Sequence, residues 1–214
     1  MTLIWHFIEL LCNYLLFYMY IQNQMSMRRK TSSLIITKQR TTEKKYKNNQ
    51  KIARIRRQRG YQWEDTIVKR FNNTNEWKAF RLGSPSIALP DVLAVNTNNS
   101  TIFTIEAKSG TSTSLPVPAD QIERCLSWIK TFDIYKKRNV LLAFKFLSKK
   151  RIGIGKYESR ELREFFKIWD ESLEITDCVC TYDGKFFAKI NGKRKELFLK
   201  ECPMPFKTKQ RTSA

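Results

Sequence analysis

Apolar and β-branched positions cluster into two short runs near the middle of the chain. The first run is Pro90–Val95 and the second is Thr101–Lys108, and the polar residues between them include no helix former. Such runs, bounded by Asn, Thr and Ser, are typical of two strands joined by a turn. Because alternate residues of a strand share a face, Glu106 and Lys108 are expected on one side and their apolar neighbours on the other. The pattern predicts a β-hairpin.

A 3.6-residue periodicity begins near Tyr61 and predicts a helix there. Glu64 falls on the same face as Ile67, Val68 and Phe71. A carboxylate on the buried face of a helix is costly unless it is paired or bound to a metal. The spacing therefore marks Glu64 as a candidate functional residue.

Further elements surround these two. A strand is expected over Trp77–Leu82 and a buried strand over Val140–Leu147. Between the hairpin and that last strand, Asp120 is expected to cap a second helix, with Gln121 on its first turn. The apolar residues at helical spacing in this second helix are Ile122, Leu126, Ile129 and Phe132. The order helix, strand, strand, strand, helix, strand predicts an α/β unit with a mixed sheet.

The chain beyond residue 150 has weaker patterns. They predict a strand over Ile152–Tyr157, a helix over Arg160–Asp170, a hairpin over Val179–Ile190 that turns at an Asp-Gly pair, and a strand over Leu197–Leu199. This extension could cover the sheet, form a dimer contact or bind DNA, and the sequence does not choose among the three.

The hydrophobic segment Leu3–Ile21 has several interpretations. It is about long enough to cross a bilayer as a helix. In that case the basic residues that follow it would stay in the cytoplasm. The start codon could instead be mis-called, with Met25 or Met27 as the true first residue, or the segment could be a helix that packs on the domain. A signal peptide fits poorly, because no basic residue precedes the segment and no small-residue cleavage site follows it.

Charge narrows the class of partner. Lys and Arg number 40 against 20 Asp and Glu, which gives a net charge of +20 and a pI near 9.9. This balance favours a polyanionic partner, nucleic acid first and an anionic membrane surface second.

Residues 25–58 form a basic arm with few large apolar residues, which predicts a largely disordered segment. Its expected role is contact with DNA phosphates, although a solubilising tail is an alternative. The basic residues expected to contact DNA are Arg56, Arg57, Arg59 and, on the later strand, Arg81.

Histidine and cysteine are not expected to carry the chemistry of a functional site in this protein. The only histidine is His6, near the terminus, so histidine-based acid/base catalysis is not expected. The five cysteines are odd in number and scattered, which favours neither a disulfide framework nor a zinc site.

The predicted hairpin carries the strongest chemical signal. Asp91 opens its first strand and can reach the Glu106 end of the second. Mg²⁺ is commonly held by one or two carboxylates together with substrate phosphate and water. A metal between Asp91 and Glu106 would polarise a phosphodiester, and Lys108 could orient water or offset transition-state charge. From spacing alone, an ordinary surface hairpin with a Glu/Lys pair is an equally good interpretation.

Taken in order, these motifs resemble the PD-(D/E)xK nuclease superfamily. The resemblance is closer to the archaeal Holliday junction resolvases, over about residues 56–150. The motifs that carry it are Arg59-Gly60-Tyr61-Gln62-Trp63-Glu64, Arg81 with Ser84, Pro90-Asp91, Glu106-Ala107-Lys108-Ser109 and Gln121. The resemblance implies a restriction-endonuclease-like α/β core, with a central mixed sheet flanked by helices. An N-terminal helix or arm and a C-terminal α+β extension are expected in addition to this core and lie outside the family pattern.

The same resemblance implies a function. It is that of a Mg²⁺-dependent endonuclease that acts as a homodimer on branched double-stranded DNA, in recombination and repair. Glu64, Asp91 and Glu106 would be metal ligands or water positioners, Lys108 would be the catalytic lysine, and Ser84 and Gln121 would support the site. The alternatives are a restriction- or repair-type nuclease on the same core, or a non-catalytic DNA-binding or membrane-tether protein.

The expected organisation has four parts. They are a hydrophobic segment at 1–24, the basic arm at 25–58, the nuclease core at 59–150 and the extension at 151–214. The protein is expected to be cytoplasmic and DNA-associated, with a membrane anchor at residues 3–21 as an option.

Overall fold

The computed structural model describes residues 49–55, 57–82, 89–153, 155–190 and 192–208. The hydrophobic segment 1–24, the arm up to residue 48, Arg56 and Ser84 lie outside this set. Within it, no helix is both long and apolar enough to span a bilayer. The chain divides into two units, residues 1–54 and 55–214, and residues 59–150 and 151–214, expected as the core and the extension, belong to the second.

The first helix of the second unit begins earlier than predicted. Residues 57–72 are helical, whereas the sequence pattern placed the start near Tyr61. Residues 49–55, in the basic arm that we expected to be largely disordered, are helical as well. The physical reason is that Lys, Arg, Ala and Gln are favourable helix formers, even where no apolar face requires a helix.

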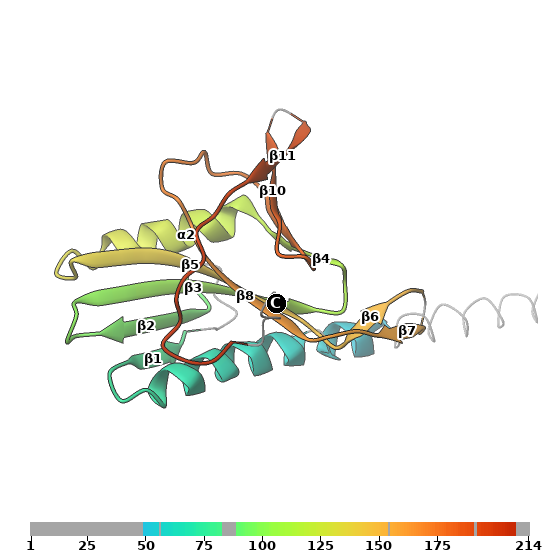
Figure 1. Ribbon diagram of the computed structural model, residues 1–214, viewed down its shortest axis with the longest axis horizontal. Helices are drawn as coiled ribbons and strands as arrows, with labels where there is room; N and C mark the ends of the chain where they lie inside the picture. The colour runs from blue at the N-terminus through green and yellow to red at the C-terminus, as the bar shows by residue number, and fades with distance from the viewer. Residues whose placement is uncertain (1–48, 56, 83–88, 154, 191, 209–214) are drawn as a thin grey trace, which may run out of the picture. The chain divides into compact units, whose positions relative to one another are not determined.

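A five-stranded mixed sheet forms the centre of the second unit (Figure 1). Its order is β1 (Lys78–Arg81), β2 (Val92–Asn96), β3 (Thr101–Gly110), β5 (Lys137–Phe146) and β8 (Arg163–Ile168). Strand β3 runs antiparallel to β2 and parallel to β5, while β5 and β8 are antiparallel. Helix α2 (Ala119–Lys130) lies within the crossover that joins the parallel pair. The predicted hairpin and mixed sheet are therefore confirmed.

Helices lie on both faces of this sheet, with α2 on one side and helix 57–72 on the other (Figure 1). Strand β3 is consequently buried on both faces. Phe103 and Ile105 belong to the apolar cluster on the side of helix 57–72, whereas the Thr104 hydroxyl donates to the Cys125 carbonyl of α2. The predicted alternation of faces is correct. Strand β3 is the middle strand of the five.

A second sheet of four strands comes mainly from the C-terminal extension. Its order is β11 (Lys193–Leu197), β10 (Phe186–Ile190), β9 (Cys178–Thr181) and β4 (Ser114–Val117). The hairpin predicted at this place is confirmed, with Gly184 at φ 83° in its turn. Strand β4 tolerates Pro116 because it lies at the sheet edge.

Three expectations for the rest of the chain are corrected. The helix expected over Arg160–Asp170 is strand β8, which buries Glu164 and Phe166 alternately. A short apolar run fits the periodicity of a helix as well as that of a strand, and here the strand is stabilised by pairing with β5. The strand expected over Ile152–Tyr157 is wrong, because residues 152, 153, 155 and 156 are not part of a strand. They lie between the two strands of a ribbon, β6 (Lys149–Arg151) and β7 (Tyr157–Ser159), and only Tyr157 is in a strand.

The third correction concerns the start of α2. Asp120 lies inside the first turn, and the N-cap position is Pro118, which makes no side-chain cap. The Ala119 N–H donates instead to Asp177 Oδ1 at 2.9 Å. A carboxylate from the extension thus supplies the cap that the sequence assigned to a local residue.

Candidate active site

The four predicted catalytic residues line one pocket. Its volume is about 320 Å³, and Glu64, Asp91, Glu106 and Lys108 contribute to its wall. Gln121, predicted as a supporting residue, lines it as well. The other lining residues are Arg57, Gly60, Tyr61, Leu89, Ala107, Ser109 and Arg124. Residues that are up to 67 positions apart in the sequence, Arg57 and Arg124, therefore meet in one place.

Local structure explains how the hairpin supplies its part of the pocket. Asp91 directly precedes β2, whose first residue Val92 is in register with Ile105 of β3. Asp91 therefore lies beside Glu106, as the sequence predicted, and its Oδ2 accepts the Ala107 N–H at 2.8 Å. This hydrogen bond fixes the carboxylate against the strand that carries the next two site residues.

Glu64 reaches the pocket from the other side of the sheet. It lies on helix 57–72, which buries Trp63, Ile67 and Phe71 against the sheet. Glu64 itself is only 7% exposed, as its position on the apolar stripe predicted. Docking of this helix thus brings a carboxylate toward the hairpin carboxylates.

Glu106 is held between two cations. Its side chain is 1% exposed. Lys108 Nζ lies 2.6 Å from Oε1, and Arg124 Nη2 lies 2.7 Å from Oε2. A buried carboxylate is tolerated when cations pair with it in this way. The sequence reasoning found Lys108 but missed Arg124, which lies three residues after Gln121 and so on the same face of α2.

Glu64 and Asp91 are less well compensated. Burial, reinforced by the charge of Asp91, raises the pKa of Glu64 to about 7. Burial and the charge of Glu106 raise the pKa of Asp91 to about 6. Glu64 Oε2 is buried and has no hydrogen-bond partner in the described part of the protein, and the same holds for Gln121 Oε1. The pocket thus contains buried acceptor oxygens that its cations and N–H groups leave without a partner.

This donor set suits a hard divalent cation. Carboxylate and amide oxygens are ligands that Mg²⁺ prefers, whereas a zinc site would be expected to use Cys or His. Among the residues that the structure describes, no group of three or more Asp, Glu, His or Cys side chains is already arranged around a metal position. The unpartnered buried oxygens of Glu64 and Gln121 suit a metal ion. Glu106 would turn one oxygen away from Lys108 or Arg124 to bind the metal as well.

The other predicted residues are placed as follows. Arg57 lines the catalytic pocket, while Arg59 lines a second, polar pocket of about 400 Å³ nearby. Arg81 lies 3.4 Å from Asp65, and its guanidinium carbon lies 5.0 Å from the centre of the Tyr61 ring. The predictions for Arg56 and Ser84 concern residues outside the described part of the chain.

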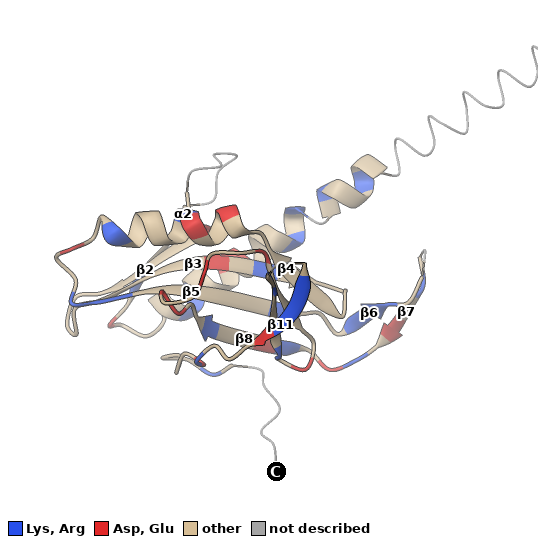
Figure 2. Cartoon of the chain, turned by 90° about the horizontal axis from the view of Figure 1, so that it is seen from above, with Lys and Arg blue, Asp and Glu red and all other residues tan. Residues whose placement is uncertain are grey.

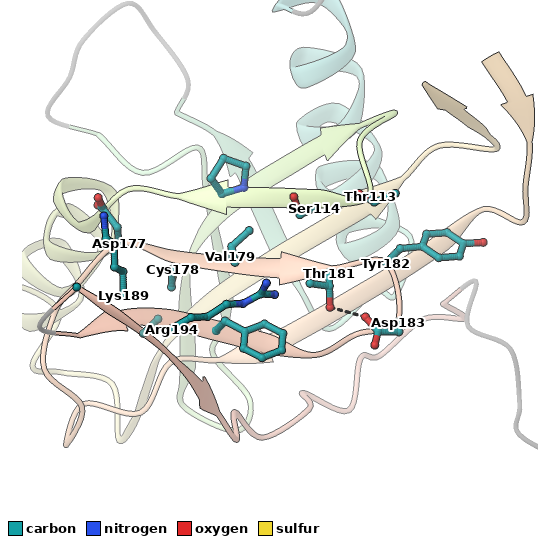
Figure 3. A pocket seen from close by; sticks show the side chains of 14 residues that line it. Thr113, Ser114, Asp177, Cys178, Val179, Thr181, Tyr182, Asp183, Lys189 and Arg194 are labelled. Carbon is teal, nitrogen blue, oxygen red and sulfur yellow. Dashed lines mark hydrogen bonds between the residues drawn. The ribbon is translucent and has the colours of Figure 1, made fainter. Parts of the chain in front are cut away.

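A larger cavity lies away from these residues. It has a volume of about 770 Å³ and lies against strands of the second sheet (Figure 3). Its wall includes Val179 and Phe187, with the Arg194 guanidinium carbon 3.8 Å from the centre of the Phe187 ring. None of the predicted site residues lines it, and it lacks the gathered carboxylates that phosphodiester chemistry needs.

Comparison with known proteins shows the family of the chain. The family model described as archaeal Holliday junction resolvase (hjc) matches residues 55–181, more than half of the 214 residues. Among solved structures, the chain is similar to Hjc of Archaeoglobus fulgidus, a Holliday junction resolvase from an archaeal hyperthermophile. The identity is 19% and the TM-score 0.36, over 53% of this chain and 85% of that one. No curated protein matches the chain. From the family match over residues 55–181, the chain belongs to the archaeal Holliday junction resolvase family and is an endodeoxyribonuclease.

Proposed function

We propose that this protein is a Mg²⁺-dependent, structure-selective endonuclease that resolves four-way DNA junctions in recombination and repair. The observation that carries the proposal is the meeting of Glu64, Asp91, Glu106 and Lys108 in one pocket. Resolvase nucleases generally use a divalent metal, and the oxygen-rich pocket favours Mg²⁺ over softer ions. When bound, Mg²⁺ would polarise the phosphodiester and lower the pKa of a water nucleophile.

Each side chain has a role that follows from its contacts. Asp91, with one oxygen on the Ala107 N–H, keeps its other oxygen for the cation. Glu64 and Glu106 would complete the protein ligands from opposite sides of the sheet. Lys108, 2.6 Å from Glu106, is placed to hold the attacking water or to offset charge that develops on the phosphate. Gln121 would support this arrangement through Oε1, a buried hydrogen-bond acceptor in the pocket.

Two sites are required to resolve one junction, because two strands must be cut. The described part of one chain holds one pocket with these four residues. We therefore propose a homodimer, in which each protomer cuts one strand. Its substrate, branched double-stranded DNA, places it with the DNA in the cytoplasm.

The test is cleavage of a synthetic four-way junction with and without Mg²⁺. Wild-type protein should cut the junction only with the metal, and Glu106→Ala should bind it without cutting. Glu171→Ala removes an exposed carboxylate far from the pocket in the sequence and should cut normally. Absence of cleavage of every branched and linear DNA by the wild-type protein would refute the proposal.

The same assay separates the alternatives. A restriction- or repair-type nuclease would cut linear duplex at least as well as the junction. A non-catalytic tether would cut neither, although a complete set of Glu64, Asp91, Glu106 and Lys108 favours an active enzyme. The membrane option concerns residues 3–21, and cell fractionation would test it, since fully soluble protein would remove it.

A further inference from the structure

The β6–β7 ribbon has no evident role in the core. It leaves β5 and projects beyond the central sheet (Figures 1 and 2). A two-stranded ribbon alone is only marginally stable. Its strands carry exposed side chains, with Tyr157 48% exposed and the adjoining Ile152 58% exposed. Apolar and aromatic side chains left in solvent beside several cations are typical of nucleic-acid-binding surfaces.

The two faces of the ribbon differ in charge. In the antiparallel register, Lys149 pairs with Ser159 and Arg151 with Tyr157, which places these four residues on one face. Lys150 pairs with Glu158 on the opposite face, and their charged atoms lie 3.8 Å apart. Within the described part of the chain, Lys149 and Arg151 make no ion pair. One face is thus basic and uncompensated, whereas the other is neutralised.

The ribbon is firmly attached to the core. Arg160 Nε donates to the Leu147 carbonyl at 2.8 Å, and Nη2 donates to the Ser112 carbonyl at 2.9 Å. The guanidinium carbon lies 4.5 Å from the centre of the Tyr182 ring. The Arg151 N–H adds a hydrogen bond to the Thr111 carbonyl at 3.0 Å. Arg160 thus ties the base of the ribbon to neighbouring segments, and Arg151 ties its outer end to the β3–β4 turn, so the basic face is presented by an anchored element.

The ribbon also starts at the catalytic end of the sheet. Phe146, the last residue of β5, is in register with Gly110, two residues beyond Lys108. The polar pocket of about 400 Å³ bridges the interval, because it is lined by Ser109 of the catalytic pocket and by Leu147, two residues before the ribbon. Its lining contains the cations Arg59, Lys69 and Lys145, and one acid, Asp65, which lies 3.4 Å from Arg81. Basic residues therefore continue from the catalytic pocket toward the ribbon.

We propose that the face of the ribbon carrying Lys149, Arg151 and Tyr157 binds the backbone phosphates of a DNA arm that flanks the cleaved strand. This inference rests on the proposed function for its ligand, branched DNA. The cations neutralise phosphates and release counterions, while the Tyr157 ring packs on sugar or base. The ribbon thus extends the contact with DNA past the catalytic pocket.

The experiment compares three single variants with the same change in charge. Lys149→Gln and Arg151→Gln alter the proposed face, and Lys150→Gln, on the same strand, alters the opposite one. Binding of a labelled four-way junction is measured in EDTA at a series of salt concentrations. Each of the first two should weaken binding several-fold and reduce the salt slope by about 1, and the double variant should reduce it by about 2. Lys150→Gln should leave both quantities close to wild type.

The outcomes separate this inference from the proposed function. Equal losses in all three variants, or no loss in any, would overturn the inference, because net charge alone would then explain binding. Another outcome is that the variants on the two faces differ in junction binding while wild-type protein never cuts the junction with Mg²⁺. That result would refute the proposed function and support the DNA-binding face. Exposed substitutions such as these should change the free energy of unfolding by no more than about 0.5 kcal/mol, so unchanged thermal unfolding verifies that each variant is folded.

Discussion

The protein contains two buried clusters of charge that are built in opposite ways. Glu164 of β8 is 0% exposed, and its two oxygens accept from Arg70 Nη1 at 2.7 Å and Nη2 at 3.1 Å, with Lys145 Nζ at 3.9 Å. In the catalytic pocket, by contrast, Glu64 keeps a buried oxygen without a hydrogen-bond partner among the described residues. Both clusters use helix 57–72, which supplies Arg70 to one and Glu64 to the other. The first is electrostatically complete and the second is not, which is the difference expected between a structural pair and a site that takes a cation.

The largest effect should come from neutralising the incomplete cluster at Glu64. Glu64→Gln keeps the shape of the side chain but removes a metal ligand, so junction cleavage should fall by about 10³-fold, or roughly 4 kcal/mol. The metal-free protein should at the same time become more stable, because a poorly compensated buried charge is lost. Single-turnover cleavage and thermal unfolding in EDTA measure the two effects. Full activity in this variant would remove Glu64 from the site.

The opposite result is expected in the complete cluster. Glu164→Ala leaves Arg70 and Lys145 without the carboxylate that they share, and breaking a buried ion pair costs about 3–5 kcal/mol. Chemical denaturation should show this loss, while cleavage by the remaining folded protein should persist. A loss of less than about 1 kcal/mol would show that the two clusters do not differ as we describe.

The contrast also shows what the sequence could reveal. The hairpin from Pro90 to Lys108 was predictable because strand alternation and a polar turn are local signals, and Glu64 because a carboxylate interrupted an apolar stripe. Arg124 was not, since its pairing with Glu106 depends on how α2 docks on β3. The two-sided burial of β3 was missed for the same reason, because it results from helices that cover both faces.

The extension was less predictable than the core. The apolar residues around Phe165 and Phe166 fit the periodicity of a helix as well as that of a strand. The strand forms because it pairs with the edge of β5. The cap of α2 by Asp177 joins residues 58 positions apart, which no local pattern could show. The fold class and the meeting of Glu64, Asp91, Glu106 and Lys108 in one pocket could therefore be predicted, whereas the contacts of Arg124 and Asp177 with distant segments could not.

A third test compares the two arginines. Arg124→Gln frees one oxygen of Glu106 and removes a positive charge next to the proposed metal position. Mg²⁺ should then half-saturate cleavage at a lower concentration, while the maximal rate falls about tenfold because Glu106 is no longer held in place. Arg124→Lys should restore part of the rate.

The matched control for that test is Arg70→Gln, which breaks the other buried arginine–glutamate pair. It should lower the stability of the protein and leave the Mg²⁺ dependence unchanged. If both arginine variants change the Mg²⁺ dependence equally, Arg124 acts through stability alone and has no positioning role.

The smallest effect is the pH dependence of stability without metal. The pKa of Glu64, about 7 in the folded protein, lies above its ordinary value of 4.5, so the folded state binds this proton more tightly than the unfolded state. Asp91, with a pKa raised to about 6, acts in the same direction. Their favourable contribution is complete below their ordinary pKa values and disappears as the pH rises through about 6 to 7. The metal-free protein should therefore lose roughly 1–3 kcal/mol of stability from these groups between pH 5 and pH 8.

Glu64→Gln should reduce this slope of stability against pH. Mg²⁺ should offset the loss of stability at high pH, because the cation replaces the proton between the same carboxylates. A slope that is identical in wild type and Glu64→Gln would mean that Glu64 does not titrate in this range, and the contrast with the Glu164 cluster would then rest on geometry alone.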